Sequence, residues 1–367
     1  MIKYLDLAYQ NKKIKAQAFR EIKRVVKNNE FILGDSLSYF EEEFAKYMEV
    51  NFVRGISNGT DALEIALRSL QLPPNAEVIV PTNSFIASAI AVKKAGLKLV
   101  LCDVDFNSSL ISAKEIQTKI TKNTKVIMPV HLYGQCAPMN EIQEVARSKD
   151  LFVVEDIAQA QGATHFGKKA GSWGDISATS FYPGKNLGAW GDAGAILTND
   201  FELYKIASML RNYGSDVKYK HDIYGFNYRM DDLQSVVLKV KLKYLDEWNK
   251  KRISLAERYR NNLSGIYSIQ IPEVLEGNVH VYHIFPILCR ERDLLQKKLW
   301  EDDIETVVHY PIPIHKQKYM QNEYIQSLYP NADKLASSVL SIPLYPGLSK
   351  KDIDHISEKI IKNCKKF

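Results

Sequence analysis

Between about residues 52 and 200, short apolar segments alternate with amphipathic ones, and this alternation constrains the fold more than any other feature. Several apolar segments are nearly continuous runs of Val, Ile and Leu, which is typical of strands covered on both faces. Such alternation predicts an α/β domain built around a mainly parallel sheet. The expected strands are 77–80, 98–104, 125–130, 151–155, 176–181 and 193–198, and the expected helices are 60–70, 84–94 and 139–149.

The pattern differs on either side of this region. Ser38 and Glu41 have the spacing of a capping box, which predicts a helix start. From Asp231 onward, apolar residues at helical spacing lead into a long polar helix and then into mixed strands and helices. We therefore expect a large α/β domain over residues 1–245, with a helical N-terminal segment, and a smaller α+β domain over residues 246–367. The expected elements of the second domain are strands at 268–271, 280–289 and 305–309 and helices at 293–300 and 350–361.

Composition argues against several classes of protein. The 49 Lys and Arg residues are dispersed among 43 carboxylates, which favours a solvated surface over a nucleic-acid partner. The four cysteines form no Cys-x-x-Cys pair, and no His has zinc-ligand spacing, so we expect reduced thiols and no metal site. The chain has neither a signal-peptide core nor an uncharged apolar run of about 18 residues, so we expect a cytoplasmic protein without membrane spans.

The first segment that could carry chemistry is the turn around Gly59, which opens an amphipathic helix. Free backbone amides at a helix start can hold a phosphate, and a glycine permits its close approach. An ordinary helix cap, with Asp61 complementing the helix dipole, explains the same residues.

Asp156 directly follows a strand that we expect to be buried. A carboxylate at this place could pair with a pyridine nitrogen and keep the ring protonated as an electron sink. The alternative is a helix-capping Asp in a loop between a strand and a helix.

Lys185 follows another expected strand, in a turn that Pro183 restrains and that glycines 184, 188 and 191 surround. A lysine held in this way, with its amine deprotonated by burial or by a neighbouring cation, suits Schiff-base chemistry. The alternative is a surface lysine in a glycine-rich loop, although Ser180 and the flanking glycines weaken that interpretation.

Together, these segments resemble the sugar aminotransferases of the DegT/DnrJ/EryC/StrS family. That family has the fold-type I architecture of aspartate aminotransferase and uses pyridoxal 5′-phosphate (PLP). The resemblance spans nearly the whole chain, in the same order along the sequence. The matching segments are 31–34, 40–47, 58–63, 81–85, 130–134, 155–159, 180–185, 225–229 and 309–310.

The resemblance implies a role for each matching residue. Lys185 and Asp156 are the expected catalytic residues, with Lys185 bound to PLP and Asp156 at the pyridine nitrogen. Gln159 is expected beside the ring hydroxyl and Phe85 on the ring face, where core packing is the alternative. The remaining expected cofactor contacts are the phosphate ligands Gly59, Thr60 and Ser180, joined by Asn227 from the partner subunit of a homodimer with shared active sites. A loop residue of the turn is the alternative for Asn227.

The resemblance also implies a reaction. L-Glutamate converts PLP to pyridoxamine phosphate (PMP), which then aminates a nucleotide-linked keto-sugar destined for a surface polysaccharide or a small metabolite. Dehydratase-like members of the family, which use PMP without a lysine bound to the cofactor, have histidine in place of this lysine. The presence of Lys185 therefore favours transamination. The expected substrate contacts are Tyr182, Asn186, Arg229, His309 and Tyr310, and a purely structural role is an equal alternative for His309.

The sequence after Tyr182 favours one substrate class. Members that act at C-4 of UDP-sugars usually have His in place of Tyr182 and a Thr-Gly-Glu-Gly-like run after the lysine. Residues 181–192 instead resemble the subgroup that converts dTDP-3-oxo-6-deoxyhexoses to dTDP-3-amino-3,6-dideoxyhexoses, although Trp190 is larger than usual. A UDP-4-oxo-sugar or inosose aminotransferase and a non-catalytic PLP-binding regulatory protein are the alternatives.

Overall fold

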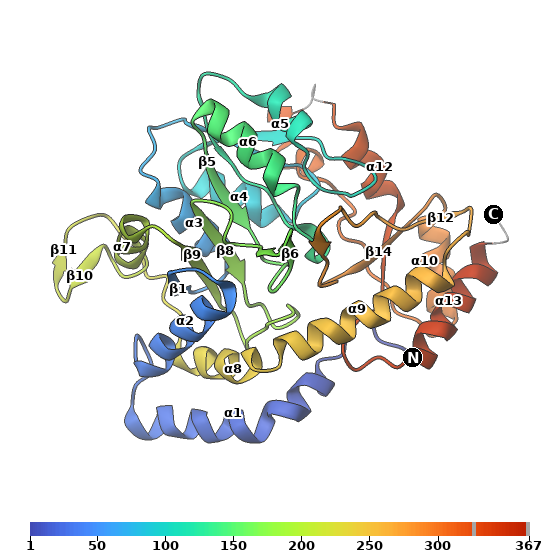
Figure 1. The fold of residues 1–367 in the computed structure, drawn as a ribbon, viewed down its shortest axis with the longest axis horizontal. Coiled ribbons are helices and arrows are strands. Elements are labelled where there is room, and N and C mark those ends of the chain that lie inside the picture. The colour runs from blue at the N-terminus through green and yellow to red at the C-terminus, as the bar shows by residue number, and fades with distance from the viewer. Residues whose placement is uncertain (325–327, 365–367) are drawn as a thin grey trace.

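The computed structural model describes residues 1–324 and 328–364, and a seven-stranded sheet forms its centre (Figure 1). The strand order is β1-β9-β8-β5-β4-β2-β3. Strands β8, β5, β4, β2 and β3 are mutually parallel, whereas β9 is antiparallel to both β8 and β1. The predicted α/β fold with a mainly parallel sheet is therefore confirmed. The strands are β1 (Phe52–Ile56), β2 (Glu77–Pro81), β3 (Lys98–Cys102), β4 (Thr124–Ile127), β5 (Phe152–Asp156), β8 (Ile176–Ser180) and β9 (Gly194–Thr198).

Helices cover both faces of the sheet, as its apolar strands require. Val78 and Val80 join the core under α3, α4 and α7, whereas Ile79 faces the core under α5 and α6. Toward β1 and β9, α2 and α8 cover the second face, and α1 packs on the outside of α8. These helices are α1 (Ala8–Asn28), α2 (Asp35–Met48), α3 (Gly59–Ser69), α4 (Ile86–Lys94), α5 (Ala113–Lys119), α6 (Met139–Lys149), α7 (Phe201–Leu210) and α8 (Asp232–Leu242).

A long helix, α9, leads from the large sheet to a smaller antiparallel sheet of order β12-β14-β15 (Figure 1). α9 begins at Leu245, the predicted domain boundary, but the division into two domains stays a prediction. Ile2 bridges to Ile304, and Ile284 joins the core of the large sheet. The elements of this part are α9 (Leu245–Asn262), β12 (Ile269–Gln270), β14 (Phe285–Cys289), α10 (Arg292–Glu301), η2 (Ile314–Lys316), α11 (Gln321–Tyr324), α12 (Pro330–Ser338), β15 (Val339–Ile342) and α13 (Lys350–Cys364).

Two further small sheets and a short 3-10 helix complete the described elements. One small sheet joins residues far apart in sequence, since β13 pairs with β6. The other is a hairpin of β10 and β11 that projects from the body of the molecule (Figure 1). The elements are η1 (Leu132–Gly134), β6 (Thr164–His165), β7 (Lys168–Lys169), β10 (Ser215–Val217), β11 (Lys220–His221) and β13 (Asn278–Val279).

Several expected elements differ from the structure. The predicted capping box is wrong, because α2 begins at Asp35 and Glu41 instead accepts a hydrogen bond from the Gly55 amide. Residues 305–309 form no strand beyond an isolated bridge of Val307 to Ser341. The predicted strand at 280–289 is confirmed only from 285, since Tyr282 has a left-handed backbone (φ 45°). Residues 365–367, the end of the predicted second domain, lie outside the described residues.

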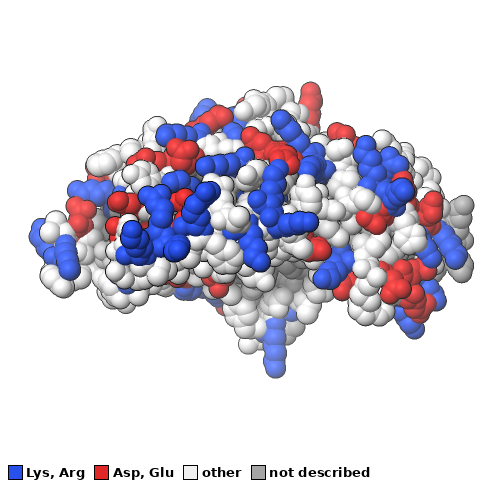
Figure 2. All heavy atoms as spheres, turned by 90° about the horizontal axis from the view of Figure 1, so that it is seen from below, with Lys and Arg blue, Asp and Glu red and all other residues white. Residues whose placement is uncertain are grey.

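Charged side chains of both signs share the face formed by α1. Figure 2 shows Lys and Arg gathered there among carboxylates. Lys13 pairs with Glu247, and Arg24 pairs with Glu21 at 3.2 Å. Within residues 1–324 and 328–364, no helix is long and apolar enough to span a membrane.

Candidate active site

A cavity of about 530 Å³ lies where the parallel strands of the large sheet end. Open α/β sheets bind ligands at this edge, because the loops that follow neighbouring strands meet there. The small sheet's side of the molecule closes the cavity through Ile284 and Leu344, and the N-terminal segment contributes Tyr4 and Leu5. The predicted site residues that line it are Gly59, Thr60, Phe85, Asp156, Gln159, Ser180, Tyr182, Lys185, His309 and Tyr310.

Lys185 lies in the turn that follows β8, and its side chain faces this cavity rather than open solvent. Burial lowers the pKa of the Lys185 amine to about 8, although the nearby Asp156 carboxylate raises it. A lysine with this pKa is partly neutral near pH 7 to 8, so it can act as a nucleophile and exchange protons.

Asp156 is the last residue of β5 and is buried. Its carboxylate accepts hydrogen bonds from the Ser88 hydroxyl (2.8 Å) and from the Ala158 amide (3.1 Å). Burial raises the pKa of Asp156, whereas these two hydrogen bonds and the charges of Lys185 and His131 lower it. A buried carboxylate of this kind is suited to hold a cationic ring nitrogen of a ligand.

Gln159 is oriented by the loop that contains η1. Its Oε1 accepts a hydrogen bond from the Tyr133 amide (2.6 Å), and its Nε2 donates to the Tyr310 hydroxyl (3.2 Å). The Tyr133 hydroxyl in turn donates to the His309 carbonyl (2.7 Å). These bonds connect the large-sheet wall of the cavity to the wall formed by residues 309 and 310.

The start of α3 meets the end of β8 and forms an anion cradle. Asn58 caps α3, with its side chain accepting from the Asp61 amide (3.0 Å). Gly59 and Thr60 are the first residues of the helix, so their amides have no acceptor within it. A Cβ at Gly59 would lie 2.6 Å from the Ser180 Cβ, so only glycine fits here. The amides and the Ser180 hydroxyl thus form a donor set that fits a phosphate.

The aromatic side chains of the cavity are exposed to it. Phe85 is 53% exposed, and its ring centre lies 5.5 Å from that of Tyr310. Exposure of this extent excludes plain core packing for Phe85 and leaves its face open to a ligand ring. Tyr182 is 60% exposed at the rim.

His309 faces the cavity, and its Nδ1 lies 2.9 Å from the Ser341 hydroxyl. Burial and the Lys185 charge lower the pKa of His309 to about 4, so its imidazole is neutral near pH 7. A neutral imidazole and a tyrosine hydroxyl can exchange hydrogen bonds with an uncharged polar ligand.

Three predicted residues lie outside this cavity. Asn186 is buried behind its wall, where its amide donates to Asn249 Oδ1 (2.9 Å) and to the Val281 carbonyl (3.2 Å), so it supports the wall instead of lining it. Asn227 is exposed. Arg229 donates to Asn212 Oδ1 (3.2 Å) and stacks over the Tyr213 ring.

Sequence reasoning missed other residues of the cavity. Ser88 lies in α4, with nothing in its neighbourhood to distinguish it from a core serine. His283 precedes β14 and shares the cavity with Lys185, but it lies 98 positions later in the chain. Only the folded chain brings these residues to Asp156 and Lys185.

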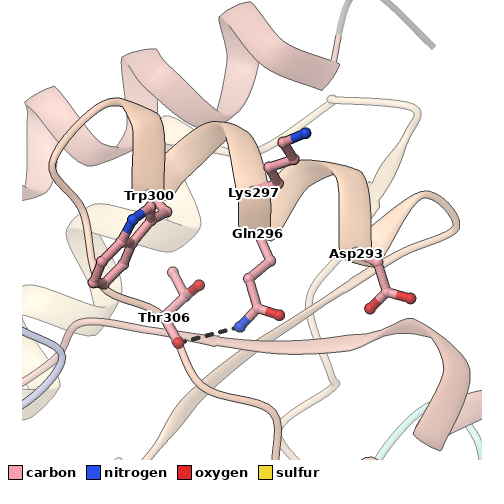
Figure 3. Close-up of a pocket in the computed structure, with 5 residues that line it drawn as sticks. All are labelled: Asp293, Gln296, Lys297, Trp300 and Thr306. Carbon is pink, nitrogen blue, oxygen red and sulfur yellow. Dashed lines mark hydrogen bonds between the residues drawn. The ribbon is translucent and has the colours of Figure 1, made fainter.

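A second hollow, of about 340 Å³, lies on α10 away from this chemistry (Figure 3). Its polar wall is closed by a hydrogen bond from Gln296 Nε2 to the Thr306 carbonyl (3.2 Å). None of the predicted site residues lies there. Among the described residues, no group of three His, Cys, Asp or Glu side chains is arranged to hold a metal ion.

Comparison with known proteins agrees with this geometry. Residues 12–361 match the model of the DegT/DnrJ/EryC1/StrS aminotransferase family. The dTDP-3-amino-3,6-dideoxy-alpha-D-galactopyranose transaminase of Aneurinibacillus thermoaerophilus is 41% identical over 98% of this chain and 99% of its own length.

Solved structures are similar over nearly the whole length. DesV of S. venezuelae, solved in complex with a ketimine intermediate, has a TM-score of 0.97 at 37% identity, covering 99% of this chain and 98% of that one. The ntda protein from Bacillus subtilis, solved with bound cofactor PMP, has a TM-score of 0.89 at 36% identity, covering 95% and 82%. The protein is therefore a PLP-dependent aminotransferase, and it belongs to the DegT/DnrJ/EryC1/StrS aminotransferase family.

Proposed function

We propose that this enzyme transfers the amino group of L-glutamate to C-3 of a dTDP-3-oxo-6-deoxyhexose, giving a dTDP-3-amino-3,6-dideoxyhexose. The observation that carries the proposal is the cavity that holds a lysine with a depressed pKa, a buried carboxylate and an anion cradle together. The relative from A. thermoaerophilus, a dTDP-3-amino-3,6-dideoxy-alpha-D-galactopyranose transaminase, supports the choice of sugar and of the position of the amino group.

Different residues of the cavity bind different parts of the cofactor. The amides of Gly59 and Thr60, with the Ser180 hydroxyl, hold the phosphate of the cofactor, and Asp156 holds its ring nitrogen in the protonated form. PLP, when bound, supplies an electron sink for charge that develops on the substrate carbon. Phe85 packs on one face of the ring and excludes water from it.

Lys185 moves the proton. Its amine has a pKa of about 8 because it is buried, so near neutral pH it can accept a proton from the substrate carbon and later return one. Asp156, which also lines the cavity, favours the protonated amine electrostatically and so opposes the effect of burial. The two opposing effects keep the pKa of the amine close to neutral pH, where it can both accept and return a proton.

The outer part of the cavity suits an uncharged hexose. Tyr182 and Tyr310 present hydroxyls there, and His309 presents an imidazole that is neutral near pH 7. Hydrogen bonds of this kind can bind the hydroxyls of an uncharged sugar, and they give no preference for a ligand that carries a carboxylate.

The test uses purified enzyme loaded with PLP. Glutamate is expected to bleach the absorbance of the cofactor, and dTDP-3-oxo-6-deoxyhexose is expected to restore it with formation of a 3-amino product identified by NMR. The control substrate is a UDP-4-oxo-sugar. Restoration by the UDP-4-oxo-sugar alone would overturn the choice of sugar, and absorbance that never responds to glutamate would overturn transamination of that donor.

We further propose a homodimer in which each active site receives Asn227 of the partner subunit. The hairpin of β10 and β11 projects from the body (Figure 1), and Tyr219 and Tyr224 are each 82% exposed around it. Exposed aromatic side chains on a projecting element are typical of an interaction surface. Asn227 follows this segment and is exposed as well.

The four cysteines are unpaired and buried, which supports a location in the reducing cytoplasm.

A further inference from the structure

A further lysine, Lys241 of α8, is buried close to the turn that carries Lys185. Its Nζ donates a hydrogen bond to the Gly188 carbonyl at 2.6 Å. Burial lowers the pKa of Lys241 to about 8, and no carboxylate among residues 1–324 and 328–364 pairs with it. Burying an amine without an anion is unfavourable, so packing alone does not explain a lysine at this position.

The carbonyl that Lys241 binds lies within the core of the protein. Leu187 and Ala189, on either side of Gly188, are buried in one cluster with Leu238 of α8. Gly188 is buried as well, so its carbonyl needs a donor from the protein in place of water. Lys241 supplies this donor from the same side of α8 as Leu238, because residues three apart in a helix are neighbours on its surface.

Gly188 in turn lies directly against the turn of Lys185. A Cβ at Gly188 would stand 2.4 Å from the carbonyl oxygen of Pro183 and 2.8 Å from that of Tyr182. The Tyr182 carbonyl also accepts the hydrogen bond from the Lys185 amide (2.8 Å) that closes the turn. Because these backbone groups are in close contact, a shift of Gly188 would move the turn that carries Lys185.

The same helix holds this segment at a second point. The Trp190 amide donates to Gln234 Oε1 at 3.0 Å. Gln234 precedes Lys241 by seven residues, or about two turns of helix, so both side chains project from one face of α8. The carbonyl of Gly188 and the amide of Trp190 are therefore both bound to α8, which fixes the position of the segment along the helix.

We propose that Lys241 is a positioning residue for Lys185, and that it holds the turn of residues 182–185 in place through the Gly188 carbonyl. This inference rests on the proposed role of Lys185 as the residue that moves the proton. An amine that transfers a proton must stay at a fixed distance from the substrate carbon. Movement of its turn therefore lowers the rate of transfer more than it weakens the binding of substrate.

Hydrogen exchange, measured by mass spectrometry on cofactor-free protein, tests this contact without substrate. Lys241→Met keeps most of the length of the side chain and removes the donor. The peptide of residues 181–192 is expected to exchange its amides about 10-fold faster than in the wild type, the change that loss of one hydrogen bond allows. Peptides from β3, at the far edge of the large sheet, are the internal reference and should exchange at the wild-type rate.

Kinetics and matched variants separate positioning from a general loss of structure. In Lys241→Met, kcat of the glutamate half-reaction is expected to fall about 10- to 100-fold, with KM for glutamate little changed. Lys243→Met removes an exposed lysine directly after α8 and should change neither kcat nor exchange. Lys241→Gln keeps an N–H donor on a shorter side chain, so we expect smaller effects than in Lys241→Met. It also carries the comparison if Lys241→Met does not fold.

Three outcomes would contradict the proposal. Unchanged exchange of peptide 181–192 in Lys241→Met would show that the bond does not hold the turn, and equal effects of Lys241→Met and Lys241→Gln would show that the donor is irrelevant. Faster exchange in the β3 peptides as well would show a general loss of structure. The exchange measurement uses neither glutamate nor a sugar, so a failure of the proposed transamination would alter the kinetics and leave the exchange result unaffected.

Discussion

Burial of Lys185 makes its amine more reactive but lowers the stability of the folded chain. The amine has a pKa of about 8 in the folded chain against an ordinary value of 10.5, so folding disfavours its protonated form. Since the unfolded chain binds the proton more tightly, this cost is fully present below pH 8 and is lost as the pH rises toward 10.5. An enzyme retains such a residue because its reactivity requires the burial.

Replacing Lys185 with methionine is therefore expected to stabilise the cofactor-free enzyme while abolishing transamination. The gain at pH 7 is expected to be on the order of 1–3 kcal/mol, since each pKa unit corresponds to about 1.4 kcal/mol. Urea unfolding at pH 7 and pH 9.5 checks both the gain and its decrease with pH. The control, Lys12→Met at an exposed position, should change neither value; a gain that is equal at both pH values would contradict this explanation.

At the scale of single elements, Glu41 shows how a helix is held by residues outside it. Its carboxylate, buried on α2, pairs with Arg211 and Arg54 at 2.6 Å each and accepts from the Gly55 amide at 2.7 Å. Arg211 follows α7, so one side chain joins two helices to the edge strand β1. Burial of Arg211 lowers the pKa of its guanidinium, and Glu41 opposes that effect.

Loss of this carboxylate would leave the buried Arg211 without its anion. Glu41→Ala is expected to destabilise the enzyme by about 3–5 kcal/mol, the usual cost of breaking a buried pair from one side. The midpoint of urea unfolding measures the change. Glu42→Ala, one position along on the exposed face of α2, is the matched control and should change stability by less than about 0.5 kcal/mol. Equal effects of the two changes would show that Glu41 acts as an ordinary surface charge.

At the scale of the whole molecule, the proposed homodimer with shared active sites makes a prediction about mixed dimers. The Lys185→Ala and Asn227→Asp variants are each expected to be nearly inactive, the second because its carboxylate would repel the cofactor phosphate. Co-expression of the two should restore about a quarter of the wild-type activity, because half of the dimers are mixed and each mixed dimer has one intact site. Transamination by purified mixtures measures this.

The control for mixed dimers pairs Lys185→Ala with Asp156→Asn. Both residues belong to the same cavity of one chain, so every site of a mixed dimer retains one defect. No activity should return in this pair. If the mixture with Asn227→Asp also stays inactive, Asn227 does not act across the subunits.

The sequence predicted the central sheet well because its strands are covered on both faces. Buried strands such as β2 and β9 consist mainly of aliphatic residues, and this pattern is local. Strand β1 escaped prediction, since Arg54 and Gly55 interrupt its apolar pattern. Its place is decided by β9 beside it and by the ion pair of Arg54 with Glu41.

Residues of the site could be predicted where they belong to a contiguous motif. Gly59, Asp156 and Lys185 each stand at a strand or helix end that the sequence pattern locates, and their order along the chain resembles the family. His283 and Ser88 carry no such signal. Their contribution depends on hydrogen bonds to Asn186 and Asp156 across the fold.

By itself, then, the sequence determined the α/β architecture and the family, because the periodicity and the order of the motifs can be read directly along the chain. On the same basis it predicted Lys185 as the lysine of the site. Only the tertiary structure decided that Asn186 supports the cavity wall, that Glu41 is an ion-pair centre and no cap, and that His283 lines the cavity. The reason is physical. Burial and hydrogen-bond partners set the charge and the orientation of a side chain, and these partners come from segments that meet only when the chain is folded.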